Sequence, residues 1–207
     1  MRRVKAEGGW GVVFTEQADV HPSSDITPYI ELRNWNDDDL PLLAAVADAI
    51  HEHGALAGIE LVHAGVNSPN LYTKEVPLAP SPLPILTFTS DPVQARAMDK
   101  EDIRNVRRWH RAAALRAKRA GFDIIYCYAG HGLTLAMQFL MRRINDRTDE
   151  YGGSLVNRLR FLCEVLEERG YVCGYTLLNS VFYGVPQMRE RMFLVAYHGD
   201  LNADVGF

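Results

Sequence analysis

Cysteine is scarce in this sequence, and its few copies do not stand at the spacing of a metal or redox site. The three thiols, Cys127, Cys163 and Cys173, form no C-x-x-C motif, and an odd number argues against a framework of disulfides. The chain also shows no signal-peptide pattern. Together these absences predict reduced thiols, no metal site and a cytoplasmic protein.

Long apolar runs and a strong net charge are missing as well. No apolar run approaches the roughly 20 residues that span a membrane, so no membrane partner is expected. The formal net charge is -4 over 207 residues, which excludes a surface that is basic throughout and leaves only a local nucleic-acid patch. With 47% hydrophobic and 23% charged residues, the composition is that of a globular chain with a sizeable core.

What is present is an alternation of strand-like and helix-like segments. Short apolar runs near glycines predict buried strands, whereas apolar residues at helical spacing between charged ones predict helices. The expected strands are 11–15, 55–62 and 123–128, and the expected helices are 37–53, 99–120 and 154–169. This order is typical of βαβ units, so the sequence predicts the α/β class with a parallel sheet.

Polar residues follow the carboxyl ends of these strands, where parallel folds bind their ligands. Thr15 stands at the first such end and Glu60 near the second. Glu60 and His63 are three residues apart, a spacing that favours packing or a cofactor edge over a metal pair. Tyr128 and His131, at the third end, are candidates for an active site, with ordinary strand-end polar residues as the alternative.

Four stretches occur in the order in which one family carries them: KAEGGWGVVFTE, GALAGIELVHAG, AGFDIIYCYAGHG and QFLMRRINDRTDEYGGSLVNRLRF. From about residue 3 to about residue 167, the chain resembles the old yellow enzyme, or NADH:flavin oxidoreductase, family. The closer likeness is to its branch of trimethylamine and dimethylamine dehydrogenases and 2,4-dienoyl-CoA reductases. The string from Asn145 to Arg158 is the most specific part of the match.

The resemblance implies a (β/α)8 barrel that binds FMN at its mouth and passes hydride between the flavin and a small amine or enone-type substrate. It places Glu60 against the pyrimidine edge of the flavin and Thr15 near the central ring. It places Tyr128 and His131 above the ring, as catalytic residues facing the substrate. NAD(P)H is then an expected electron partner.

The same resemblance leaves parts of the family without a counterpart. The family's first strand would precede Met1, and its last four strands, with their phosphate-binding loops, are not matched. We therefore expect a partial (β/α)8 TIM-barrel fragment, with FMN binding weak or lost and a homo-oligomer formed through exposed barrel edges. Gln17 replaces an aromatic residue of the ammonium cage in trimethylamine dehydrogenase-like members, which disfavours a quaternary amine.

A second resemblance begins after Gly170. The segment LNSVFYGVPQMRERMFLVAY resembles part of DNA (cytosine-5) methyltransferases, over about residues 169–199. In that family the positions of Gln187, Arg189 and Arg191 face the target cytosine and its backbone, which suits the forked hydrogen bonds of arginine. No cysteine here follows a proline, so the nucleophile for methyl transfer is absent.

The two resemblances predict two domains. Residues 1–168 would be a truncated FMN-dependent oxidoreductase domain, and residues 169–207 a short foreign α/β tail like the methyltransferases. In the tail, strands are expected at 171–178 and 192–197. The favoured function is FMN-dependent hydride transfer, impaired by truncation. The alternatives are a DNA-binding remnant of a methyltransferase and an inactive fusion fragment.

Overall fold

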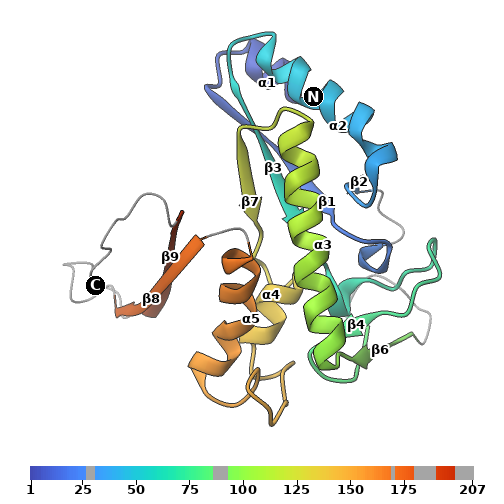
Figure 1. The fold of residues 1–207 in the computed structure, drawn as a ribbon, viewed down its shortest axis with the longest axis vertical. Coiled ribbons are helices and arrows are strands. Elements are labelled where there is room, and N and C mark those ends of the chain that lie inside the picture. The colour runs from blue at the N-terminus through green and yellow to red at the C-terminus, as the bar shows by residue number, and fades with distance from the viewer. Residues whose placement is uncertain (27–30, 86–92, 169–170, 180–189, 199–207) are drawn as a thin grey trace. The chain divides into compact units, whose positions relative to one another are not determined.

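The structure is a computed structural model of the chain (Figure 1). It describes residues 1–26, 31–85, 93–168, 171–179 and 190–198. The chain divides into two compact units, Met1–Leu162 and Cys163–Phe207, and each unit is described by itself. The division falls inside a helix, and the domain boundary expected after residue 168 stays a prediction.

A four-stranded parallel sheet organises the first unit, in the order β2–β1–β3–β7. The strands are β2 (Leu32–Arg33), β1 (Val12–Asp19), β3 (Leu56–Val62) and β7 (Ile124–Cys127). The three strands expected from the sequence are therefore adjacent and parallel, as in consecutive βαβ units. This confirms the α/β class and the topology expected for a barrel fragment.

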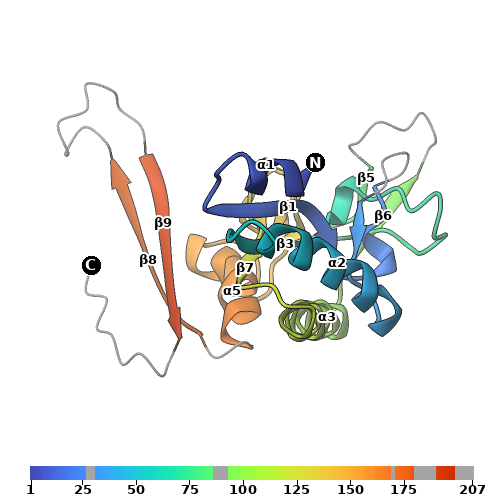
Figure 2. The ribbon, with the colours of Figure 1, turned by 90° about the horizontal axis from the view of Figure 1, so that it is seen from above.

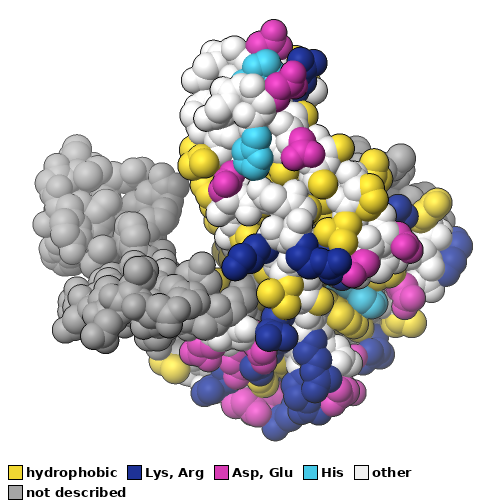
Figure 3. All heavy atoms as spheres, turned by 45° about the horizontal axis from the view of Figure 1, so that its top comes forward, with side chains coloured by type: hydrophobic (Ala, Val, Ile, Leu, Met, Phe, Trp, Pro, Cys, Tyr) yellow, Lys and Arg dark blue, Asp and Glu magenta, His cyan; other side chains and the backbone are white. Residues whose placement is uncertain are grey.

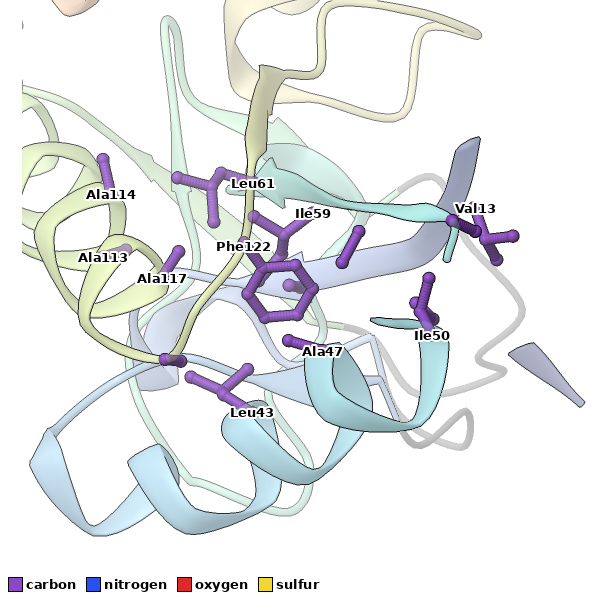
Figure 4. Packing of buried hydrophobic residues seen from close by; sticks show 14 of the residues in the cluster. Val13, Leu43, Ala47, Ile50, Ile59, Leu61, Ala113, Ala114, Ala117 and Phe122 are labelled. Atoms are coloured by element: carbon purple, nitrogen blue, oxygen red, sulfur yellow. The ribbon is translucent and has the colours of Figure 1, made fainter. Parts of the chain in front are cut away.

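Two helices pack on one face of this sheet, α2 (Leu40–His51) and α3 (Lys100–Arg119) (Figure 2). Alternate residues of β3 turn to this face and are fully buried, because successive side chains of a strand point to opposite sides. The main core lies between them (Figure 4), and its members include Val13, Leu43, Ala47, Ile50, Ala57, Ile59, Leu61, Ala113, Ala117 and Phe122. On the other side of β3, Leu56 is 47% exposed.

Helix α3 begins and ends where its sequence signals predict. Asp99 is the N-cap, and its carboxylate accepts the amide of Asp102 while the Asp102 carboxylate accepts the amide of Asp99. Such a capping box satisfies amide donors that have no partner within the helix. The chain leaves the helix through Gly121 at a φ of 93°, a left-handed conformation that glycine adopts without strain. The predicted helix 99–120 is therefore confirmed.

The remaining elements include several that the sequence did not predict. Helix α1 (Arg2–Glu7) precedes β1, and the mostly apolar helix α4 (Leu135–Leu140) follows β7. The segment expected to be irregular, 63–98, contains a small sheet in the order β4–β6–β5. Its strands are β4 (Leu78–Ala79), β5 (Leu83–Pro84) and β6 (Gln94–Ala97), and 3-10 turns occur at Pro22–Ser24, Asp37–Asp39 and Gly65–Asn67.

Helix α5 (Leu155–Glu167) matches the third predicted helix, and the Ser154 hydroxyl accepts the Asn157 amide at 3.2 Å, as an N-cap does. In the second unit, β8 (Tyr171–Asn179) pairs antiparallel with β9 (Glu190–His198). These strands confirm the two that were predicted for the tail. Across the described residues, no helix is long and apolar enough to cross a membrane.

Candidate active site

The residues predicted to face a flavin lie on neighbouring strands, with Thr15 within β1, Glu60 within β3 and Tyr128 just past β7. The Glu60 amide on β3 donates to Thr15 Oγ on β1 at 3.1 Å, where the ladder between β1 and β3 shifts register. The Tyr128 amide, just past β7, donates to the Leu61 carbonyl at 3.1 Å. Three polar side chains that are far apart in sequence thus lie on adjacent strands, but β1 continues past Thr15 to Asp19, so Thr15 is not at the strand end where the sequence placed it.

Glu60 is a half-buried carboxyl group among other acids. Burial is the main cause that raises its pKa, with further increases from Glu16 and Glu31, while His131 acts in the opposite direction. Burial and Glu16 also raise the pKa of Glu31. A carboxylate that is poorly compensated by its own protein is suited to accept a hydrogen bond from a ligand or to attract a cation.

Tyr128 and His131 form a hydrogen-bonded pair, in which the phenol meets the imidazole Nδ1. Burial, followed by Glu60 and Tyr126, raises the pKa of Tyr128, so the phenol keeps its proton at neutral pH. The phenol ring lies over Gly130, where a Cβ would stand 2.8 Å from the ring. Glycine at position 130 therefore makes room for Tyr128.

Aromatic side chains lie next to this pair, on the side of the sheet opposite α2 and α3. Phe14 meets Tyr126 edge to face with centroids 6.1 Å apart, and Tyr126 lies 6.0 Å from Tyr128. Tyr126 is 47% exposed. Because Tyr126 and Tyr128 are two apart on a strand, both point to the side opposite the helices. The site thus joins an apolar aromatic surface to a few polar groups, which is typical of small-molecule sites.

His63 serves a different purpose from Glu60. It is fully buried, and burial lowers its pKa well below the ordinary value, so the ring is neutral. Its Nδ1 accepts the Gly65 amide at 3.1 Å, and its Nε2 donates to Ser23 Oγ at 2.9 Å. Both nitrogens are therefore used in holding the loop after β3. Among the described residues, no group of three His, Cys, Asp or Glu side chains could hold a metal ion.

The long motif at 145–158 holds loops together. The Arg147 guanidinium pairs with Asp149 and also donates to the carbonyls of Pro80 and Met98 at 3.0 and 2.5 Å. The Asn145 amide donates to the carbonyls of Phe139 and Tyr151 at 2.7 and 2.8 Å. Each polar group closes a loop over buried backbone, so the motif is structural here.

The side chains predicted to contact nucleic acid are not among those that the structure describes. Gln187 and Arg189 lie outside the described residues, and Arg191 lies in β9, where only the backbone pairing with Leu178 is described. On the face shown in Figure 3, basic and acidic side chains of the described residues are interspersed, with no broad field of one sign. Ion pairs also bring the two signs together on α3, where Glu101 contacts both Arg104 and Arg108.

Sequence reasoning missed three residues at this end of the sheet. Glu31 contributes to the acidic surroundings, and Tyr126 to the aromatic surface, which the two-residue period of a strand could have indicated. Asn67 is 4% exposed, and its side-chain amide donates to the Gly132 carbonyl at 3.1 Å. Nothing in the local sequence signals this contact, because it joins residues 65 positions apart.

In parallel sheets of the α/β class, ligands bind near the carboxyl ends of the strands. Comparison with known proteins then gives the family. A profile of the NADH:flavin oxidoreductase / NADH oxidase family matches residues 1–183, and this chain belongs to that family. The match extends into residues 169–183, where the sequence suggested a foreign tail, and the likeness to methyltransferases stays a prediction.

Several relatives are enzymes named for amines. Dimethylamine dehydrogenase from Hyphomicrobium sp. (strain x) is 39% identical over 177 residues, covering 81% of this chain and 23% of the relative. The structure of histamine dehydrogenase from Rhizobium sp. 4-9 is 62% identical with a TM-score of 0.78, and covers 81% of this chain and 24% of its own.

A third relative is 6-hydroxypseudooxynicotine amine oxidase from Pseudomonas geniculata N1, whose structure is 49% identical with a TM-score of 0.79. The match covers 81% of this chain and 25% of the amine oxidase chain. The chain thus spans about a quarter of the length of these relatives. The matched structures confirm the fold as part of the barrel family of old yellow enzyme.

Proposed function

We propose that this chain supplies the ring-facing and substrate-facing part of an FMN-dependent oxidoreductase that acts on a small amine. The observation that carries the proposal is the meeting of Thr15, Glu60, Tyr128 and His131 across three neighbouring strands, in a chain that belongs to a flavin oxidoreductase family. When bound, FMN would supply a two-electron acceptor for hydride.

The residues present suit the flavin ring. The Glu60 carboxylate can accept a hydrogen bond from the N3–H of a pyrimidine edge, and its neighbours leave it without a strong cation partner. Thr15 Oγ already accepts the Glu60 amide, so its hydroxyl hydrogen is available for a second acceptor. These contacts contribute roughly 1 kcal/mol each. These contacts reach the flavin ring and not the phosphate of FMN. We therefore expect the chain alone to bind FMN weakly.

Tyr128 and His131 would act on the substrate nitrogen. When Nδ1 of His131 carries no proton, the Tyr128 oxygen can accept a proton from an ammonium while the phenol's own proton passes to Nδ1, as in general-base pairs. The amine is then neutral, and its lone pair assists hydride loss from the adjacent carbon. The acids Glu16, Glu31 and Glu60 favour the arrival of a cationic amine at this end of the sheet.

Gln17 indicates which kind of amine would suit the site. It pairs with Glu60 in the ladder, and its Oε1 is buried without a hydrogen-bond partner among the described residues. An amide oxygen accepts hydrogen bonds, so an amine that retains an N–H suits it better than a quaternary ammonium. Reduction of an enone with NAD(P)H is the second candidate, favoured by the same Tyr128 donor, which could hold a carbonyl oxygen.

The test is a titration of the purified chain with FMN, followed by quenching of flavin fluorescence. We expect weak but saturable binding that Glu60→Leu weakens further. Glu75→Leu removes the same charge from an exposed loop position and should leave binding unchanged. Quenching that Glu60→Leu leaves unchanged would overturn the proposed site.

Two other expectations remain proposals. A homo-oligomer through exposed barrel edges predicts a sedimentation coefficient above that of a 23.3 kDa monomer. A DNA-binding role for Gln187, Arg189 and Arg191 predicts an affinity for duplex DNA that falls steeply with salt. Loss of that affinity in a double Arg189→Ala, Arg191→Ala variant would support the DNA reading, and unchanged affinity would remove it.

A further inference from the structure

The loop after β3 is tied to the loop after β7 by hydrogen bonds that cross between them. The Leu135 amide donates to the His63 carbonyl at 2.7 Å. Gln138, which is fully buried, donates to the Ala64 carbonyl at 2.7 Å and accepts the Val66 amide at 2.9 Å. These bonds fix residues 63–66 against the start of α4. The neighbouring residue Asn67 reaches the turn that carries His131.

That turn has an unusual backbone. His131 has a φ of 55° and Gly132 a φ of 69°, so two successive residues are left-handed. Glycine adopts this conformation freely, whereas for an L-residue such as histidine it is disfavoured roughly fivefold to thirtyfold in population. Within the turn, the Leu133 amide donates to the Gly130 carbonyl at 3.2 Å. A contact from outside the turn would help to hold His131 in this conformation.

We propose that Asn67 is this support, a positioning residue whose side-chain amide holds the Gly132 carbonyl and thereby keeps His131 against the Tyr128 hydroxyl. The contact is 3.1 Å long, and Asn67 is 4% exposed, so little water is available to replace it. The catalytic meaning of this role rests on the proposed function, whereas the role in conformation does not.

The direction of the bond accounts for the residue type. Only a donor can pair with the Gly132 carbonyl, and the amide of asparagine offers two N–H groups on a short side chain. Its own backbone amide is used in the loop, where it donates to the Ala64 carbonyl at 3.1 Å. The donor is therefore held rigidly by the tie between the two loops. Loss of the donor would release the Gly132 carbonyl and allow His131 to relax to a right-handed conformation.

The test is carried out on the flavin-free chain with ¹³C-labelled tyrosine and histidine rings. Nuclear Overhauser contacts between the rings of Tyr128 and His131, whose centroids lie 5.8 Å apart, report the pair directly. We expect Asn67→Ser and Asn67→Leu to reduce these contacts at least fivefold. Serine keeps a small polar side chain that is too short to reach Gly132, so it serves if the leucine variant does not fold.

The matched control is Asn145→Ser, which removes another buried asparagine amide, one that donates to the carbonyls of Phe139 and Tyr151 and not to that of Gly132. It should lower stability and leave the contacts between the rings unchanged. Retained contacts in a folded Asn67→Ser protein would overturn the proposal, as would an equal loss in Asn145→Ser. Because no flavin is present, loss of the contacts supports the role of Asn67 even if the FMN titration of the wild type fails.

Discussion

Two carboxylates at opposite ends of the same parallel strands have opposite surroundings. Asp123, just before β7, accepts the His51 Nε2–H at 2.7 Å and the Ala57 amide at 2.8 Å. These hydrogen bonds, that of His51 first, lower its pKa. Glu60, near the carboxyl end of β3, has its pKa raised, mainly by burial. One end satisfies its charged group from within the protein, whereas the other does not.

Hydrogen bonds within the protein therefore stabilise the amino end of the sheet, whereas polar groups at the carboxyl end stay available to a ligand. Bonds at the amino end join α2 to the start of β3 and β7, and they need no ligand. The carboxyl end places Glu60, Tyr128 and His131 together with groups that a ligand could complete. In barrels of this kind, the amino-terminal face serves stability and the carboxyl-terminal face serves function.

The largest expected effect tests the strand that links the two ends. Ile59→Ala removes a fully buried side chain from the core and should lower the free energy of unfolding by about 2–5 kcal/mol. Leu56→Ala, on the opposite side of β3 and 47% exposed, should cost roughly 0.5 kcal/mol. Urea denaturation of both variants measures the difference.

Equal costs for the two variants would contradict this assignment of faces. They would mean that the exposed side of β3 is covered in solution, as a homo-oligomer would require. Denaturation at several protein concentrations separates these cases, because the stability of an oligomer depends on concentration.

Much of this frame could be predicted from the sequence, for reasons visible in particular segments. The runs ending in Thr15, Val62 and Tyr128 are apolar and lie near glycines, which marks buried strands. The length of β1 was underestimated, because Glu16 and Gln17 after the register shift look like a loop. Helix α4, LAMQFL, was missed because a short apolar run has no amphipathic period.

The site was predicted less completely. Family resemblance and strand ends together identified Thr15, Glu60, Tyr128 and His131. The support from Asn67 and the charge of Glu31 arise only from tertiary packing, and no local pattern encodes them. The role of each residue toward a flavin stays a prediction until binding is measured.

The second prediction concerns the amino end. Asp123→Asn removes the charge that pairs with His51, and because this pair is partly exposed it should cost about 0.5–1 kcal/mol at neutral pH. The pKa of Asp123 is lowered in the folded chain, so its contribution is present above the unfolded pKa and is lost as pH falls through the folded pKa. Melting temperatures of wild type and variant, measured from pH 7 to pH 2.5, should converge at the acidic end. A constant gap over this range would show that the carboxylate charge contributes nothing.

The smallest expected effect has the opposite sign and concerns the carboxyl end. The pKa of Glu60 is raised in the folded chain, so the folded state holds this proton more tightly than the unfolded state does. Stability from this group is therefore greatest below the unfolded pKa and decreases as pH rises through the folded pKa. Glu60→Gln removes the titration and keeps the size, so it should stabilise the chain by a few tenths of a kcal/mol at pH 7, since partial exposure screens the charge.

Below about pH 4, close to the ordinary pKa of a glutamate, this gain from Glu60→Gln should vanish, because Glu60 is then protonated in both states. The melting curves of the Glu60 and Asp123 variants should consequently diverge from wild type in opposite directions as pH rises. Glu60→Gln should also weaken the binding of FMN, because an amide oxygen accepts a hydrogen bond from the flavin N3–H less strongly than a carboxylate does. A variant that is more stable and binds flavin less well would be a direct trade of function against stability at this position. If Glu60→Gln instead destabilised the chain at pH 7, Glu60 would be a structural residue like Asp123, and the contrast between the two ends would fail.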